Sequence, residues 1–122
     1  MDDCLFFNEE PRALPLYEAV RDYICKEFEN VKIKVQKTQI SFSNRYGFAF
    51  VSLPFRKVKG RPDVYIILTL GLNRRLVHPR IAEATEPYPE RWTHHIIIQN
   101  ENEIDFEIKE WINEAYTFSM TK

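Results

Sequence analysis

Apolar residues recur along this chain with two different periods. Over residues 16–24 they fall at helical spacing after Pro15, which predicts an N-terminal helix. A second stripe with helical spacing covers residues 104–118, and Asn100 or Asn102 precedes it as a candidate cap. We therefore expect the chain to open and close with an amphipathic helix.

Between these helices the apolar period shortens to two, which is the pattern of β-strands. Residues 48–53 and 64–70 are apolar on both faces, so we expect these two segments in the centre of a sheet. The expected strands are residues 31–35, 38–43, 48–53, 64–70 and 93–99.

Residues 71–92 carry no strand pattern and contain Pro79, Pro87 and Pro89. We expect an ordered irregular segment here, with a short helical turn over residues 79–84, which covers part of the sheet face away from the helices. Short connections between the strands favour antiparallel pairing. The predicted fold class is α+β, a single antiparallel sheet of about five strands with an N-terminal and a C-terminal helix packed on one face.

The length of 122 residues corresponds to a single domain, residues 1–122, in which residues 1–10 form an acidic N-terminal tail. No apolar run reaches the roughly 18 residues that a membrane span needs. The first residues are acidic where an export signal would be basic, so we expect a cytoplasmic protein without a membrane partner. In that compartment we expect Cys4 and Cys25 to be free thiols.

The net charge of −1 hides an uneven distribution of charged residues. Residues 1–30 hold eight acidic and three basic residues, and residues 96–122 hold six acidic and two basic ones. Residues 31–95 hold twelve basic and four acidic residues. One interpretation is a basic sheet that attracts two acidic helices, and the other is an anion-binding surface on the middle segment.

The motifs of several enzyme and cofactor classes are missing from the sequence. It has no G-x-S-x-G nucleophile elbow, no Walker A loop and no dinucleotide-binding fingerprint. His78 could join His94 or His95 and a nearby glutamate on a metal ion, but no ligand spacing supports this. We therefore expect no cofactor and no metal, and no motif specifies a reaction or a catalytic residue.

Basic and polar side chains are the remaining candidates for a site. An arginine presents two parallel N–H donors to a carboxylate or phosphate, so a dense group of arginines favours anion binding. The alternative is that these arginines pair with Glu83, Glu86 and Glu90 of the same stretch. The candidate ligand-binding residues are Lys37, Gln39, Arg74, Arg75, Arg80, Arg91, His94 and His95.

Two adjacent histidines close this set. Side chains alternate along a strand, so His94 and His95 must point to opposite faces of the sheet. We expect one imidazole to be buried beneath the helices and the other to face the arginine-rich segment, where it could titrate near neutral pH. Thr93 and Gln99 share the face of His95, which makes His95 the better candidate for the open side.

Six segments of the sequence carry a resemblance to a known family: LYEAVRDYI, KTQISF, RYGFAFVSLP, LTLGLNRRLVHPRI, EPYPERWTHHIII and EIDFEIKEWINEAY. Together they resemble the bacterial family called domain of unknown function 5655, over about residues 12–118. The resemblance implies a small α+β domain, alone or appended to other bacterial domains, including some linked with nucleic-acid defence, and it implies no known activity. It favours the candidate site residues above, which lie within the family's motifs.

These observations favour an anion-binding module that takes a phosphorylated small molecule or a nucleic-acid backbone on its Arg/His-rich segment. Nucleic acid is the weaker partner, because the net charge is −1 and neither helix is basic. One alternative is an enzyme with a histidine general base and arginines that stabilise charge. Another is a structural domain that self-associates as a homodimer through Phe106, which lies off the apolar stripe.

Overall fold

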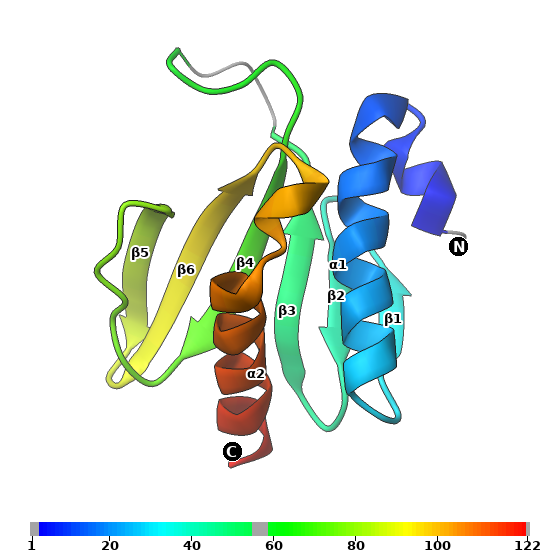
Figure 1. Cartoon of the computed structure of the whole chain (residues 1–122). Coiled ribbons are helices and arrows are strands. Elements are labelled where there is room, and N and C mark those ends of the chain that lie inside the picture. Colours follow the sequence, from blue (N-terminus) through cyan, green and yellow to red (C-terminus); the bar gives the residue numbers. More distant parts are fainter. Residues whose placement is uncertain (1–2, 55–58, 122) are drawn as a thin grey trace.

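The computed structural model describes residues 3–54 and 59–121 of the chain, which form two α-helices, six β-strands and three short 3-10 helices. Figure 1 shows both α-helices in front of one sheet. The bounds are η1 Asp3–Phe7, η2 Pro11–Ala13, α1 Leu14–Glu27, β1 Lys32–Val35, β2 Ile40–Ser43, β3 Gly47–Ser52, β4 Ile66–Leu72, β5 Ile81–Tyr88, β6 Arg91–Ile98, η3 Glu101–Glu103 and α2 Phe106–Met120.

The six strands form one antiparallel sheet in the order β1-β2-β3-β4-β6-β5, so the predicted α+β class with a single antiparallel sheet is confirmed. The expected number of about five strands is too low by one. Residues 81–88 form the edge strand β5, where we expected an irregular segment with a helical turn. Most side chains of β5 are exposed, so this strand lacks the apolar alternation that marks a half-buried strand.

The strand register places a continuous row of buried side chains on one face of the sheet, which we call the core face. On this face the ring of Tyr17 from α1 stacks on Phe42, with ring centroids 6.1 Å apart. Tyr116 from α2 packs edge-on against Phe48 at 5.1 Å. The row, in paired order from β2 to β6, is Phe42, Ala49, Leu70 and His94.

The next row of paired residues points to the opposite face, which we call the outer face. Its members are only partly buried or are exposed. In β2, β3, β4 and β6, however, the residues directly before and after the member of this row are buried. The row, in paired order from β1 to β5, is Lys34, Ser41, Phe50, Thr69, His95 and Glu83.

The segment between β4 and β5 does not cover the outer face as expected. Leu76 from this segment is buried in the hydrophobic core. Its backbone N–H donates to Nε2 of His94 on the core face, over 2.9 Å. The hydrogen bond to the buried His94 imidazole holds this part of the segment against the core face, and it therefore does not lie on the outer face.

The entry to the C-terminal helix differs in one detail from the expectation. Asn100 caps the short η3 helix and forms a capping box with Glu103. The α2 helix begins separately, with Asp105 as its cap, and the Asp105 carboxylate accepts from the Ile108 N–H at 3.1 Å. Within the described ranges, no helix is both long and apolar enough to cross a membrane.

Candidate functional site

The structure does not bring the arginines of the candidate set together. Arg74 makes two hydrogen bonds of 2.8 Å to the carboxylate of Glu114 on α2. Arg80 holds both carboxylate oxygens of Asp105 at 3.0 Å and donates to the carbonyl of Glu103 at 2.7 Å. These two guanidinium groups are thus neutralised by acids at α2, and their role here is to attach the segment between β4 and β5 to that helix.

The other three basic candidates make no ion pair among the described residues. The guanidinium of Arg75 lies 5.7 Å from the ring centroid of Trp92. Arg91 is exposed at the start of β6, and Lys37 is exposed between β1 and β2. The expected partners Glu83, Glu86 and Glu90 are not the acids that hold the arginines.

His78, which lies outside the candidate set, belongs to the same attachment. Its Nε2 lies 3.0 Å from the Glu107 carboxylate, and its Nδ1 accepts from the Arg80 N–H at 3.1 Å. The ring meets Trp111 edge-on, with centroids 5.2 Å apart. Among the described residues, no group of three or more histidine, cysteine or acidic side chains could hold a metal ion.

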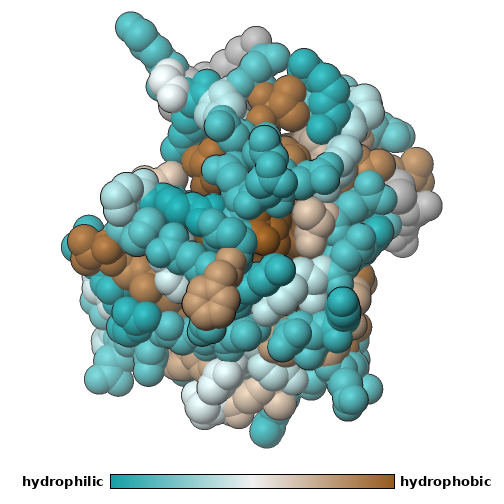
Figure 2. Space-filling model, in the orientation of Figure 1, coloured by the Kyte–Doolittle hydropathy of each residue, from teal (hydrophilic) through white to brown (hydrophobic). Residues whose placement is uncertain are grey.

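This attachment gives the helix side of the molecule a hydrophilic surface. Figure 2 shows the side that carries the helices, and hydrophilic residues cover most of it. The basic segment therefore meets acids of one helix, α2, which agrees in part with the interpretation that acidic helices attract the basic middle of the chain.

His94 is the buried member of the histidine pair and is fully inaccessible to solvent. Because its Nε2 accepts from the Leu76 N–H, Nδ1 carries the proton, and no described residue accepts a hydrogen bond from it. Burial lowers the pKa of the His94 imidazole, although the nearby backbone of Leu70 opposes this change. His94 is thus held neutral and acts as part of the core.

His95 lies on the outer face, partly exposed, where its Nδ1 is 2.9 Å from Oγ1 of Thr69 on the neighbouring strand. This contact fixes the plane of the imidazole. The described residues leave its Nε2 without a hydrogen bond, so this nitrogen can donate to or accept from a ligand.

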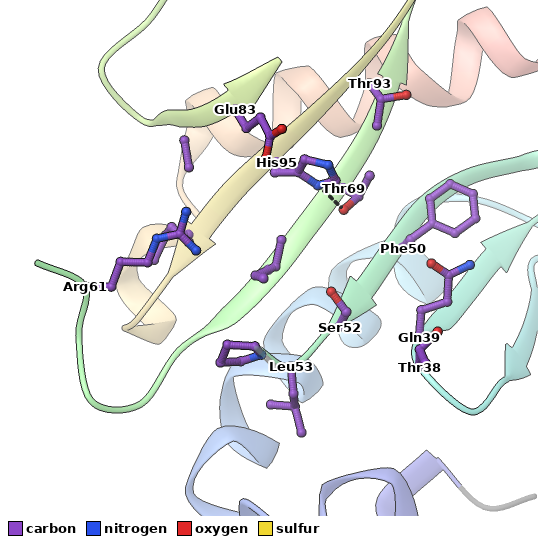
Figure 3. A pocket seen from close by; sticks show the side chains of 14 residues that line it. Thr38, Gln39, Phe50, Ser52, Leu53, Arg61, Thr69, Glu83, Thr93 and His95 are labelled. Atoms are coloured by element: carbon purple, nitrogen blue, oxygen red, sulfur yellow. Dashed lines mark hydrogen bonds between the residues drawn. The ribbon is translucent and has the colours of Figure 1, made fainter. Parts of the chain in front are cut away.

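His95 and Gln39 both line a hollow of about 490 Å³ on the outer face. Figure 3 shows it between the strand carrying Phe50 on one side and Arg61 and Glu83 on the other. A volume of this order is ordinary for a small-molecule site, which typically combines an apolar lining with a few polar groups. We call this site the outer-face hollow; it is lined by Thr38, Gln39, Phe50, Ser52, Leu53, Pro54, Arg61, Ile67, Thr69, Ala82, Glu83, Thr93, His95 and Ile97.

Arg61 is the cation of the hollow. It is exposed, and its guanidinium lies 6.0 Å from the ring centroid of Tyr65, with Nη1 3.5 Å from the tyrosine hydroxyl. Among the described residues, no carboxylate forms an ion pair with it. Arg61 therefore differs from Arg74 and Arg80, because its charge remains available to a ligand.

Sequence reasoning found two residues of the hollow, Gln39 and His95, and missed Phe50, Thr69 and Arg61. Thr69 carries a usable signal, since it is the one aliphatic hydroxyl residue in the apolar run of residues 64–70. Phe50 carries none, because an aromatic residue in a central strand is equally expected in the core. Its place depends on the pairing with Thr69, which only the register reveals.

Comparison with known proteins adds one finding. A family model described as Domain of unknown function (DUF5655) matches residues 5–119, which is nearly the whole chain. No curated protein and no solved structure gives a significant match.

Proposed function

We propose that this chain, which belongs to the DUF5655 family, is a cytoplasmic bacterial module that binds a small organic anion in the outer-face hollow. The observation that supports this most is the hollow itself, where a guanidinium without a carboxylate partner among the described residues and an oriented imidazole border an apolar floor. The proposal moves the anion site away from the arginine-rich segment, whose Arg74 and Arg80 already hold carboxylates.

The composition of the hollow limits the ligand to a molecule with two different parts. Phe50, Ile67 and Ile97 offer apolar surface that only a hydrocarbon or ring system would cover. Arg61 offers a fork of N–H donors that suits a carboxylate or phosphate. An inorganic anion would bind Arg61 but leave the apolar surface of the hollow exposed to water, so an organic anion fits better.

The proposal includes the predicted arrangement in which both helices pack on the core face. With the helices there, no helix or strand among residues 3–54 and 59–121 covers the outer face, and a ligand can reach it. Glu83 lies on the same row as His95 and repels anions from the β5 end of the hollow. The anionic group of the ligand is therefore expected beside Arg61.

The test is calorimetric titration of the whole chain with phenyl phosphate and with benzoate at low salt. We expect saturable binding that weakens at least about threefold in Arg61→Gln, because one charged hydrogen bond contributes roughly 1 kcal/mol or more. Arg75→Gln is the matched control, since Arg75 is an exposed arginine outside the hollow that lies on Trp92. Equal losses in both variants, or no saturable binding, would contradict the proposal.

An enzyme remains the second candidate, on one specific observation. The Thr69 hydroxyl and the His95 imidazole are within hydrogen-bond distance at 2.9 Å, as in a hydroxyl nucleophile paired with its base. A p-nitrophenyl phosphate or ester assay distinguishes the two functions. Turnover that Thr69→Val and His95→Gln both abolish would favour the enzyme, whereas binding without turnover favours the module.

A further inference from the structure

We propose that the organic anion is a nucleotide, with its base on Phe50 between Gln39 and His95 and its phosphate on Arg61. This inference rests on the proposed function, because it names the class of ligand for the same outer-face hollow. It is carried by three features of the hollow: a flat aromatic surface, two hydrogen-bonding groups beside that surface, and across from it one arginine without a carboxylate partner among the described residues.

The flat surface depends on a bulge in β3. The β2–β3 register shifts between Phe42 and Ser43, so that β3 has one residue more than its partner. Gly47 and Phe50 consequently lie on the same face, and a Cβ on Gly47 would come within 2.8 Å of Cζ of the Phe50 ring. The ring thus lies along the strand over the space that glycine leaves, and Figure 3 shows it beside Gln39, across from Arg61 and Glu83.

Phe50 is partly exposed. An accessible aromatic ring on a sheet is a general surface for stacking a nucleobase, since every base has a flat π face. Most other residues that line the hollow are aliphatic or small and polar, so Phe50 is the place where a planar ring gains most. An aliphatic anion such as a fatty acid would gain little from the ring orientation that Gly47 permits.

The two hydrogen-bonding groups are already oriented. Nε2 of Gln39 donates to Oε1 of Gln36 at 3.2 Å, and the same oxygen accepts from the Ser41 hydroxyl at 2.8 Å. Oε1 of Gln39 is left as an acceptor that no described residue uses. This oxygen and Nε2 of His95 can form hydrogen bonds with the donors and acceptors at the edge of a nucleobase. A benzene-like ring has no such groups.

The charges of the hollow set the number of phosphates. Arg61 can hold one phosphate through its paired N–H groups, while Glu83 faces the hollow from β5 with a negative charge. Further phosphates would meet this carboxylate without another described cation in the lining. A nucleoside monophosphate is therefore expected to bind at least as tightly as the triphosphate.

The experiment is a calorimetric titration of the whole chain with adenosine and guanosine monophosphates, adenosine, ATP and inorganic phosphate. We expect the monophosphates to bind, and inorganic phosphate to bind at least tenfold more weakly. Phe50→Leu should weaken monophosphate binding about tenfold, within the range that loss of one stacked base produces. Arg61→Gln should weaken binding of the monophosphate but not of adenosine.

Gly47→Ala is a second variant for the stacking surface, because its Cβ displaces the Phe50 ring without removing it. It should weaken monophosphate binding while leaving phenyl phosphate binding less affected. Arg75→Gln again serves as the control. A short single-stranded oligonucleotide separates the two sources of the same chemistry: tighter binding with a steep salt dependence identifies a strand, and equal binding per site identifies the free nucleotide.

The outcomes separate this inference from the proposed function. If phenyl phosphate binds the hollow and no nucleotide does, the ligand class is wrong and the anion site stands. If monophosphates bind and Phe50→Leu has no effect, the base does not stack on Phe50 and this inference is overturned. If neither probe binds, both proposals are wrong.

Discussion

His94 and His95 are neighbours on β6, yet they belong to two different regions of the molecule. His94 lies on the core face, has no solvent exposure, and accepts a hydrogen bond from a buried backbone N–H. His95 lies on the outer face, is partly exposed, and is held by the Thr69 hydroxyl at the edge of a hollow. One strand therefore carries two histidines with different roles: His94 belongs to the core, and His95 belongs to a candidate site on the opposite face.

The basic residues of the two regions show the same contrast. On the helix side, Arg74 and Arg80 form ion pairs with carboxylates, and these pairs attach the segment between β4 and β5 to α2. In the outer-face hollow, Arg61 has no acidic partner among the described residues. The density of arginines along the sequence thus does not show which charges are available to an anion, because tertiary contacts decide the availability of each one.

The largest expected effect is on the core face, in Trp111→Ala. Trp111 is only 8% exposed and packs in the core, and truncation of a buried tryptophan costs about 3–5 kcal/mol. Phe106→Ala is the matched control on the same helix, because Phe106 is 77% exposed and should cost less than about 0.5 kcal/mol. Urea unfolding of both variants measures the difference.

The same pair of variants tests self-association. If Phe106→Ala is as destabilising as Trp111→Ala, or if it changes the mass measured by sedimentation, Phe106 belongs to an interface between copies. In that case the contrast between the buried and exposed faces of α2 would not hold.

The next effect is a pH dependence of stability that arises from His94. Its pKa is lowered in the folded state by burial, so the unfolded chain binds more protons. The contribution of His94 is fully present above its unfolded pKa of about 6.5, and it is lost as the pH falls toward the folded pKa, by at most about 1.4 kcal/mol per pH unit. Arg74, Glu114 and His95 are the other charged or titratable groups that influence it.

Unfolding free energies measured between pH 7.5 and pH 5 test this prediction. We expect wild type to lose stability over this window and His94→Gln to lose much less. His95→Gln is the control and should keep the wild-type slope. A slope that follows His95 would reverse the roles assigned to the two faces.

Smaller effects are expected for the arginines on the helix side. Arg80→Ala should cost about 1–2 kcal/mol, since Arg80 is mostly covered and its hydrogen bonds involve a carboxylate and a backbone carbonyl. Arg74→Ala should cost less than about 1 kcal/mol, because its pair with Glu114 is more exposed. Thermal unfolding of the two variants ranks them, and the reverse order would contradict this account of the attachment.

The sequence predicted the parts of the fold that bury apolar surface in a regular period. Both helices and the strands β1–β4 and β6 lie where the apolar spacing places them. The sequence did not predict the edge strand β5, because the residues around Glu83 and Glu86 are exposed and do not alternate between apolar and polar. These residues form a strand because their backbone pairs with β6, and backbone pairing does not require any pattern of apolar side chains.

The candidate site was less accessible to sequence reasoning than the fold. The opposite orientation of His94 and His95 follows from strand alternation alone, and the structure confirms it. Which arginines remain available does not follow, because Arg74 meets Glu114 across 40 residues of sequence and only the tertiary fold creates that contact. The hollow likewise depends on the register that sets Phe50 beside Thr69.

The central claim is that the outer face binds the anion and the core face does not. The most direct test is an NMR titration of the whole chain with phenyl phosphate, in which the signals of the backbone amides and both histidine rings are followed. We expect saturable shifts at the His95 ring and at the amides of Thr69 and Ile97, with the His94 ring and the amides of residues 73–80 unchanged. Saturable shifts centred on Arg74 and Arg80, with none at His95, would place the anion on the helix side and contradict the account.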